Sequence, residues 1–440
     1  MRTQYTSFIA ALARFLSPQV WKQAHQLHSP KKTSPRWTLH SLVLILLLMT
    51  WSTGHSEAER FEMARAFYVA RHQHDKRPGQ TRSGFHQALA KLPLPVLHAL
   101  FAGVRQYLRL VFHRCWHSDG FVLFACDGSR LECPRSAELE KRLGRCGKKD
   151  SAPMLMIGAL VLLPAGLLWS WTVGPGHASE HDLLRQSLGC LPRSALLVAD
   201  AFYQGYDLYR DLLQAKASFL VRLSSRSQLY TAERVPLQRY GEGPVLYWPE
   251  QAQNKNKPPL WLRLIRVRGQ KKQDVWLLTN VLDRQRLGRR RAAEIYRSRW
   301  QVEGVFRTYK RTLPKIKLSG RTEKLVYREA EVSLLGLQLL LAQGAAKRRE
   351  GGRATIVLGS ARQELLRIRG EMTTAIGAEL GPRQQRWYRE RLARVRAGGG
   401  GRKVRRKWPR RKDHKAPKPP KIRVLPKRLK ARINKQFPAL

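Results

Sequence analysis

Apolar side chains recur at helical spacing through the first quarter of the chain. The segment SEAERFEMARAFYVARHQ, which begins at the helix-capping Ser56, and the segment PVLHALFAGVRQYLRLVFHR each place apolar residues on one helical face. After residue 118 the pattern changes to short apolar runs bounded by turn residues, which is typical of strands. We therefore predict a helical region over residues 1–118.

Strands and helices alternate over residues 119–222. FVLFACDGSRL (121–131) has the composition of a strand, residues 154–173 read as strand–turn–strand, and ALLVAD (195–200) precedes the helix YDLYRDLLQA and the strand FLVRL. The order of strand, hairpin, helix, strand, helix is that of a ribonuclease H-like core. An ordinary α/β domain begins in the same way, so this pattern leaves both folds open.

The next two segments differ in kind. Residues 223–285 alternate short β-type runs with turn residues, which predicts an all-β insertion. Residues 286–348 contain one long helix, IYRSRWQVEGVFRTYKRTL, and an apolar packing helix, EVSLLGLQLLLAQGAAKR. We expect these helices to complete the α/β domain that the insertion interrupts.

The end of the chain is basic. Residues 349–397 have a helical pattern, and a run of glycines follows them. Residues 398–440 are rich in Lys, Arg and Pro and contain a single acid, Asp413. A segment of this composition buries too little apolar surface to fold alone, so we predict a flexible basic tail.

Composition adds a strong charge to this picture. The 440 residues include 83 Lys+Arg against 31 Asp+Glu, a net charge of +52, while 43% hydrophobic residues and 12 Trp indicate a globular protein. Such an imbalance repels itself unless a polyanion neutralises it, so the sequence predicts nucleic acid as the partner. An anionic membrane surface is the weaker alternative.

The apolar runs and the cysteines bear on location. LVLILLLMTW (42–51) is too short to span a membrane, and turn residues interrupt the run at 154–173. The five cysteines are odd in number and include no C-x-x-C pair, which indicates free thiols in a reducing compartment. The segment HRCWH offers His113, Cys115 and His117 as zinc ligands, but no second half of a tetrahedral site is evident. We predict a cytoplasmic protein without membrane association.

Two aspartates end apolar strand-like runs. Asp127 follows FVLFAC and Asp200 follows ALLVA, and a carboxylate in such a place is costly unless it is paired, solvated or bound to a cation. With Glu303 they would place three hard oxygen donors at one sheet edge, the ligands that suit Mg²⁺ or Mn²⁺. Either aspartate alone is equally well explained as a turn-forming or helix-capping residue. Turn or helix-surface positions account for four further aspartates of this region, Asp119, Asp182, Asp207 and Asp211.

Tyr296, Arg299, Glu303 and Lys310 form a Tyr-x2-Arg-x3-Glu-x6-Lys pattern. On one continuous helix, offsets of 0, 3, 7 and 14 residues fall on a single stripe. The stripe holds a lone carboxylate flanked by two cations and a phenol, which suits a metal-dependent site acting on a phosphodiester backbone. The alternative is a solvated face with an Arg299–Glu303 ion pair.

Three stretches make residues 120–345 similar to a known family: ACDGSRL, VADAFYQGYDLYRDLLQAKASFLVRL and IYRSRWQVEGVFRTYK. The chain resembles DDE transposases of the insertion-sequence group that is defined by the Tyr-x2-Arg-x3-Glu-x6-Lys signature. The resemblance implies a ribonuclease H-like catalytic core, split by an all-β insertion, in which Asp127, Asp200 and Glu303 bind two Mg²⁺ ions that Mn²⁺ can replace. It also implies that Ser129 occupies the hydroxyl position two residues after the first aspartate.

The activity that the resemblance implies is cut-and-paste DNA transposition. Such enzymes hydrolyse DNA at the ends of a mobile element, and the freed 3′-hydroxyl then attacks target DNA. Tyr296, Arg299 and Lys310 would contact the DNA, the N-terminal helices would recognise the terminal repeats, and a homodimer would hold both ends in the bacterial cytoplasm, associated with the nucleoid. A metal-dependent nuclease without strand transfer and a catalytically inert DNA-binding relic remain as rivals.

One position departs from the family pattern. Relatives that form a DNA hairpin stack a flipped base on a Trp of the β domain, and Trp276 in DVWLLTN is the natural candidate. Counted back from Glu303, the family pattern expects this Trp one residue earlier, at the position of Val275. A shift of one residue reverses the face of a strand on which a side chain lies. Either a bulge restores the face, or Trp276 lies in the core and Trp261 or Trp248 serves instead.

Overall fold

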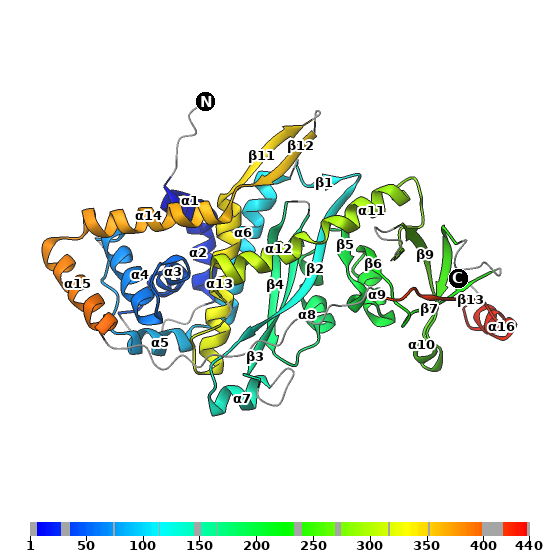
Figure 1. The fold of residues 1–440 in the computed structure, drawn as a ribbon, viewed down its shortest axis with the longest axis horizontal. Helices are drawn as coiled ribbons and strands as arrows, with labels where there is room; N and C mark the ends of the chain where they lie inside the picture. Colours follow the sequence, from blue (N-terminus) through cyan, green and yellow to red (C-terminus); the bar gives the residue numbers. More distant parts are fainter. Residues whose placement is uncertain are drawn as a thin grey trace.

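Three parts follow one another along the long axis of the computed structural model: a helical part, a central sheet and a β-rich end (Figure 1). The structure describes residues 7–27, 36–73, 75–113, 115–144, 151–163, 165–232, 240–268, 274–315, 317–350, 353–397 and 417–437.

The helical part begins with short helices whose first turns are capped by hydroxyl side chains. Ser7, Ser17, Thr38, Ser56 and Thr81 each accept a hydrogen bond from the backbone N–H three residues further on. The helices are α1 (Phe8–Phe15), α2 (Pro18–Gln26), α3 (Leu39–Trp51), α4 (Glu57–Arg71), α5 (Arg82–Lys91) and α6 (Leu94–Phe112).

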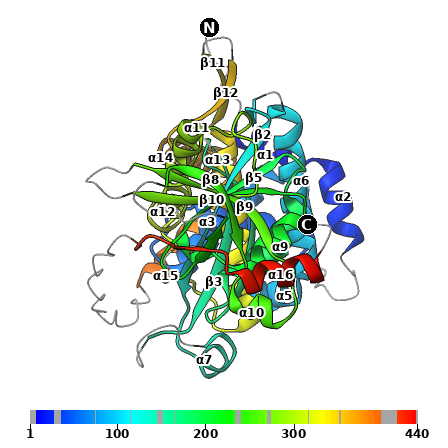
Figure 2. The same ribbon diagram turned by 90° about the vertical axis from the view of Figure 1, so that its right-hand side faces the viewer.

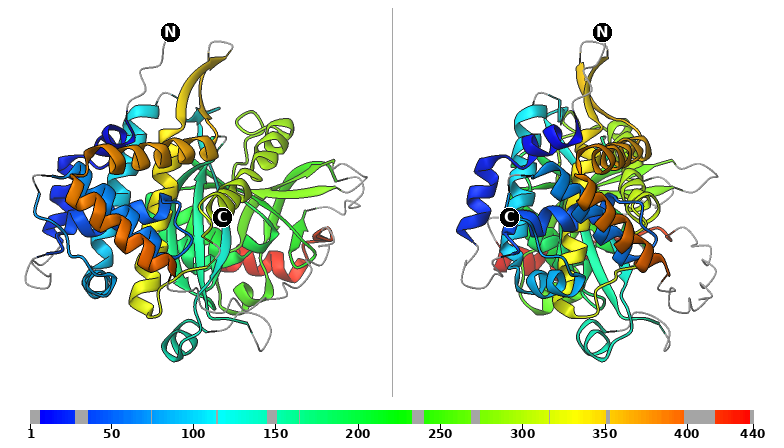
Figure 3. Two further views of the ribbon diagram at one scale, coloured as in Figure 1. Left: turned by 60° about the vertical axis from the view of Figure 1, so that its left-hand side comes forward. Right: turned by 90° about the vertical axis from the view of Figure 1, so that its left-hand side faces the viewer.

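The apolar helix α3 lies at the centre of this part. It is buried on every side, which explains its uninterrupted apolar sequence. It packs on α13 (Glu323–Gln343), where the indole Nε1 of Trp51 donates to the carbonyl of Gly336 at 3.2 Å. The later helices α14 (Ala361–Glu379) and α15 (Pro382–Ala397) lie over α4, so distant parts of the sequence share one core (Figure 3).

A mixed sheet of 11 strands runs through the rest of the molecule. Its first strands are β1 (His117–Ser118), β2 (Phe121–Glu132), β3 (Met154–Leu162), β4 (Leu167–Pro175), β5 (Ala195–Ala199) and β6 (Ser218–Arg222). β3 and β4 form an antiparallel hairpin beside β2, whereas β5 and β6 pair in parallel on its other side. The helices α7 (Ala137–Leu143), α8 (Glu180–Ser187) and α9 (Tyr206–Gln214) connect them.

The segment predicted as an all-β insertion extends this same sheet. Its strands are β7 (Gln228–Thr231), β8 (Glu242–Tyr247), β9 (Leu260–Val267) and β10 (Val275–Thr279). β10 pairs with β6, so the strands do not form a sheet of their own, and the short helix α10 (Glu250–Asn254) lies among them. The description "all-β" was therefore wrong for this segment, because the sequence pattern showed its strands but concealed one helical turn.

The predicted signature helix is divided. α11 (Arg289–Ser298) and α12 (Gln301–Arg307) are separate, and the wider turn Thr308–Thr312 continues α12. At the junction the N–H groups of Arg299, Trp300 and Val302 donate to carbonyls three residues earlier, which tightens the helix locally. The single-stripe prediction is thus wrong in detail.

The chain changes direction after α13. The predicted packing helix ends at Gln343, and β11 (Ala345–Glu350) and β12 (Arg353–Leu358) then form a two-stranded ribbon that projects from the body (Figure 1). The apolar side chains of α13 stabilise it by packing on α3 and β4. The helix ends where these apolar side chains end.

Part of the predicted flexible tail is folded. Residues 398–416 lie outside the described ranges, but β13 (Lys421–Val424) pairs in parallel with β7, and α16 (Lys427–Gln436) lies beside α10 (Figure 2). Leu429 and Ile433 are buried, one helical turn apart. The average composition of the tail hid these two apolar positions, and β7 supplies a partner that the tail alone lacks.

The structure also bears on the apolar runs and the cysteines. Within the described ranges, no single helix is long and apolar enough to cross a membrane, and α5 and α6 pass that test only as a pair that is bent by 83°. Cys115, Cys126, Cys133 and Cys190 are free, and Cys146 lies outside the described residues.

Candidate active site

Asp127 and Asp200 lie side by side at one edge of the central sheet. The parallel register pairs Ala125 of β2 with Val198 of β5, and each aspartate comes two residues later. The Oδ1 of Asp127 accepts a hydrogen bond from the Gly128 N–H at 2.8 Å, and the Oδ1 of Asp200 accepts one from the Phe202 N–H at 2.8 Å. Both carboxylates therefore leave the sheet in the same direction with local backbone support.

Glu303 reaches this edge from α12, which packs on β2 and β3. Its Oε1 lies 3.4 Å from Nη2 of Arg299. Seven residues further on, Nζ of Lys310 donates to the Oγ of Ser129 at 2.6 Å, so this helical segment contacts β2 beside Asp127. The divided helix thus still brings Arg299, Glu303 and Lys310 to one sheet edge.

Arg299 is the buried cation of this group, with only 7% of its surface exposed. Burial disfavours a charged guanidinium, but Tyr296, Asp200, Asp127 and Glu303 together raise the pKa of Arg299 above its ordinary value. The guanidinium therefore lies within the electrostatic reach of all three acids that the sequence singled out. Its position partly neutralises their mutual repulsion.

The carboxyl group of Asp127 lies in an environment that raises its pKa. Burial is the main reason that its pKa is raised to about 6, and the charges of Asp200 and Glu180 raise it further. The Gly128 N–H and Arg299 act in the opposite direction. A bound cation would favour the ionised form, so this environment suits a positively charged ligand.

Glu180, which the sequence analysis passed over, is a further acid at this edge. It is the first residue of α8, and its Oε2 accepts a hydrogen bond from the Tyr203 hydroxyl at 3.1 Å. A Cβ built on Gly128 would come within 2.5 Å of that Oε2, so the carboxylate lies directly against β2 beside Asp127. Burial and the charge of Asp200 raise the pKa of Glu180.

The sequence held one signal for Glu180 that pattern reasoning did not use. Gly128 and Gly158 stand opposite each other on β2 and β3, and a Cβ at Gly158 would come within 2.9 Å of the Leu183 side chain in α8. Paired glycines on adjacent strands allow a helix to approach a sheet closely. Without this signal, an acid at the start of a helix is most simply explained by its favourable interaction with the helix dipole.

Known families and solved structures include proteins that are similar to this chain. Residues 119–337 match the family model described as the transposase DDE domain. The chain contains a DDE transposase domain. A solved structure of the piggyBac transposase synaptic complex with hairpin DNA is similar to this chain at a TM-score of 0.45 and 10% identity, covering 89% of this chain and 86% of that one. No curated protein matches the chain.

DDE transposases generally use divalent metal ions. The carboxylate oxygens of this domain are the type of ligand that hard divalent ions prefer. In the described part of the chain, one group of three candidate ligands has all its donor atoms within 4.8 Å of one another: His40, His72 and Asp75, in the helical part. The three acids of the DDE domain do not form such a group, nor do His113, Cys115 and His117.

The aromatic candidates separate clearly by exposure. Trp276 is 5% exposed and Trp248 is fully buried, whereas Trp261 is 46% exposed. The pairing of β9 with β10 shows no register shift at Trp276, which faces Arg266 across the ladder. No bulge therefore turns the ring outward, and the assignment of Trp276 to DNA stacking does not fit this structure. Trp300, which the sequence analysis did not consider, is 63% exposed beside Arg299.

The four aspartates that the sequence assigned to turns or helix surfaces each form an ion pair. Asp119 pairs with Arg291 at 2.6 Å in a turn where its φ is 53°. Asp182 and Asp211 both bind Arg185, at 2.6 Å and 2.5 Å. Asp207 pairs with Lys257.

Proposed function

We propose that this protein is a cut-and-paste DNA transposase, which cleaves DNA at the ends of a mobile element and joins the freed 3′ ends to target DNA. The observation that carries the proposal is the register of β2 and β5, which sets Asp127 beside Asp200 under α12. These residues all lie within the matched DDE domain. A DNA partner also agrees with the net charge of +52.

We infer a ribonuclease H-like core for this domain. The strand order β4-β3-β2-β5-β6, with an antiparallel hairpin on one side of β2 and parallel strands on the other, supports this inference. The residues from β7 to β10 would then be the insertion that separates the second aspartate from Glu303. The insertion-sequence group with the Tyr-Arg-Glu-Lys signature is the corresponding family assignment.

Asp127, Asp200 and Glu303 would hold two Mg²⁺ ions, which Mn²⁺ could replace. When bound, such ions activate the attacking oxygen and stabilise the leaving oxygen of an in-line displacement. Arg299 and Lys310 would neutralise phosphates next to the scissile bond, Arg299 with a planar fork and Lys310 as a point charge. Ser129 positions the Lys310 ammonium group, and Tyr296 would donate to a phosphate oxygen.

The test uses full-length protein and a linear DNA that carries the flanks of its own gene. Cleaved ends and joined products are measured with Mg²⁺, Ca²⁺ or EDTA, for the wild type and for Glu303→Gln. Glu390→Gln, at a 54% exposed side chain of α15, is the matched control. We expect Mg²⁺-dependent cutting and joining that only Glu303→Gln abolishes.

Other outcomes of that experiment would contradict the proposal. Cutting without joining would identify a related nuclease, and tight binding without chemistry would identify an inert DNA-binding relic. We also propose that a homodimer holds the two ends, in the cytoplasm on nucleoid DNA. Light scattering of the protein with and without flank DNA measures the number of subunits, and a persistent monomer would exclude the dimer.

A further inference from the structure

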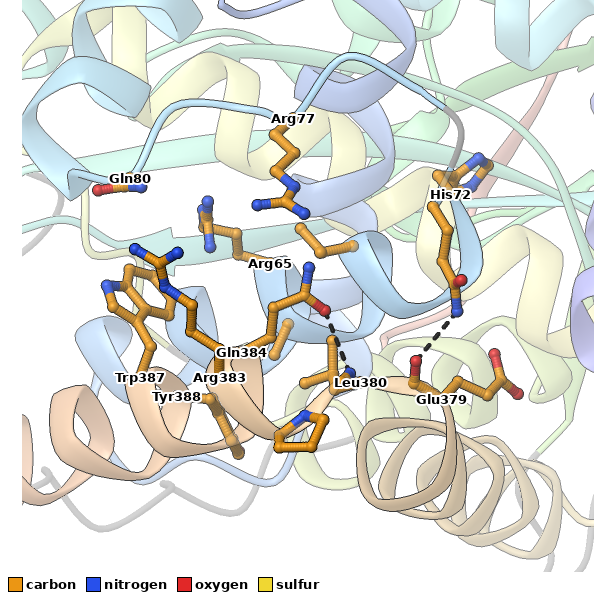
Figure 4. Close-up of a pocket in the computed structure, with 15 residues that line it drawn as sticks. Arg65, His72, Arg77, Gln80, Glu379, Leu380, Arg383, Gln384, Trp387 and Tyr388 are labelled. Carbon is orange, nitrogen blue, oxygen red and sulfur yellow. Dashed lines mark hydrogen bonds between the residues drawn. The ribbon is translucent and has the colours of Figure 1, made fainter.

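The N-terminal helices meet the C-terminal ones at the end of the molecule remote from β7–β10 (Figure 1). A basic cavity lies between them (Figure 4). Its volume is about 650 Å³. The walls are α4, the segment after it, and the turn between α14 and α15. Neither the family match nor the signature pattern reaches α15.

Three guanidinium groups from three segments face the cavity. Arg65 comes from α4, Arg77 from the following loop and Arg383 from the first turn of α15, and Figure 4 shows them turned toward the same space. Gln80 and Gln384 add amide groups to the lining. The arrangement offers several N–H donors and positive charge to one ligand.

The acids close to the cavity already have other partners. Glu62 binds Arg391, with Nη2 and Oε1 2.6 Å apart, and Glu379, which itself lines the cavity, binds Arg71 at 2.9 Å. Neither Arg77 nor Arg383 forms an ion pair with a residue that the structure describes. Both side chains are exposed, so their charges are available to a ligand from solution.

Arg65 is buried and positions the loop that carries Arg77. Its Nε donates to the carbonyl of Gly79 at 2.8 Å and its Nη2 to that of Pro78 at 3.2 Å. Burial lowers the pKa of Arg65 to about 10, and the like charges of Arg391 and Arg77 lower it further against the attraction of Glu62. An anion in the cavity would relieve this repulsion.

Trp387 decides which part of a nucleic acid fits. The guanidinium of Arg65 lies 4.6 Å from the centre of its ring, and that of Arg391 lies 4.9 Å from it. Cations thus occupy the ring that a base would otherwise use for stacking. What remains for a ligand is charge and N–H donors, which bind phosphates and not bases.

We propose that this cavity binds the phosphate backbone of duplex DNA, with Arg77 and Arg383 as the contacting residues. The inference rests on the proposed function, because it adds a second DNA contact remote from the DDE acids. Contacts on both walls tie α4 to α15 when DNA is bound. A cavity of about 650 Å³ is also far larger than one phosphate ion needs, which favours a polymer.

The test compares full-length protein with the double variant Arg77→Gln/Arg383→Gln. The control is Arg193→Gln/Lys216→Gln, which removes two exposed charges that stand two residues before the start of β5 and of β6. Affinity for a fluorescent flank duplex is measured in Ca²⁺ over a series of KCl concentrations. We expect the cavity variant to bind about tenfold more weakly, and the slope of log K against log[KCl] to fall by about 2.

The remaining outcomes are also decisive. Arg77→Lys/Arg383→Lys should keep most of the slope, since the charge is retained. Equal slopes for the cavity variant and its control would overturn the inference, as would loss of inorganic phosphate binding with unchanged DNA binding. If the wild type cleaves DNA and the cavity variants bind DNA as tightly as it does, only this inference is refuted. If the wild type never cleaves DNA, only the proposed function is refuted.

Discussion

Asp127 carries a carboxyl group whose protonation the fold favours, since burial raises its pKa from 3.8 to about 6. Ionisation of this carboxyl group therefore costs more free energy in the folded protein than in the unfolded chain. At this scale the sequence predicted much of the candidate site, because acids that end apolar strands must either pair, meet water or bind a cation. It did not predict Glu180, whose place depends on how α8 approaches β2.

We predict that Asp127→Asn stabilises the protein in EDTA at neutral pH. The gain should be absent below about pH 4, grow as the pH rises to about 6 and then stay constant, reaching about 3 kcal/mol at most. Urea unfolding between about pH 4 and pH 8 measures it. Asp207→Asn is the opposing control, because a hydrogen bond from Lys257 lowers the pKa of Asp207 and its variant should lose stability. A pH-independent difference would contradict the prediction.

Glu180→Gln tests the additional acid. The amide can keep the hydrogen bond from Tyr203, so the fold should persist, but one negative charge beside Asp127 disappears. We expect the Mg²⁺ concentration that gives half-maximal thermal stabilisation to rise about tenfold. Asp182→Asn, on the same helix and 64% exposed, should leave it unchanged. Equal midpoints for the two variants would remove Glu180 from the site.

At the scale of elements, local patterns predicted what short-range physics decides. The apolar runs of β2 and β5, and the existence of α4 with its Ser56 cap, follow from local sequence alone. The division between α11 and α12 could not be predicted from the sequence. It depends on backbone hydrogen bonds between residues three apart, which amino-acid composition does not indicate. The pairing of β10 with β6 and of β13 with β7 joins distant segments, and sequence periodicity carries no information about partners.

The ordered part of the tail gives a prediction at this scale. Leu429→Ala or Ile433→Ala should detach α16 from the β-rich end, because each deletes a buried side chain worth about 2 kcal/mol or more. Limited trypsin digestion should then cut within residues 421–436 sooner than in the wild type. Asn434→Ala, at an exposed position of the same helix that is not a trypsin site, is the control. Unchanged protection in both apolar variants would show that the helix is held by other contacts.

For the whole molecule, charge dominates behaviour. A net charge of +52 means that the free protein opposes its own compaction. Salt screens this repulsion but also weakens contacts to DNA phosphates. The sequence predicted this property in full, since it needs only a count of residues, whereas the continuous sheet of 11 strands required the structure.

We therefore predict that salt acts in opposite directions on the free and the bound protein. From about 0.05 to about 0.5 M KCl the melting temperature of the free protein should rise, while the stabilisation given by added duplex DNA should shrink. Differential scanning fluorimetry measures both. The same series in NaCl separates screening from specific ion binding. A melting temperature that falls with salt in the absence of DNA would contradict the prediction.

The pairing of β13 with β7 also has a consequence for protein synthesis. β13 comes after every other strand of its sheet in the sequence, and about 190 residues separate it from its partner. During translation the backbone N–H and C=O groups on one side of β7 stay unpaired until β13 has been made. Unpaired strand edges of this kind pair readily with other chains. A gene copy interrupted anywhere before β13 would leave that edge open permanently. Damaged copies should therefore yield a protein that aggregates or is degraded, and does not compete with the intact one.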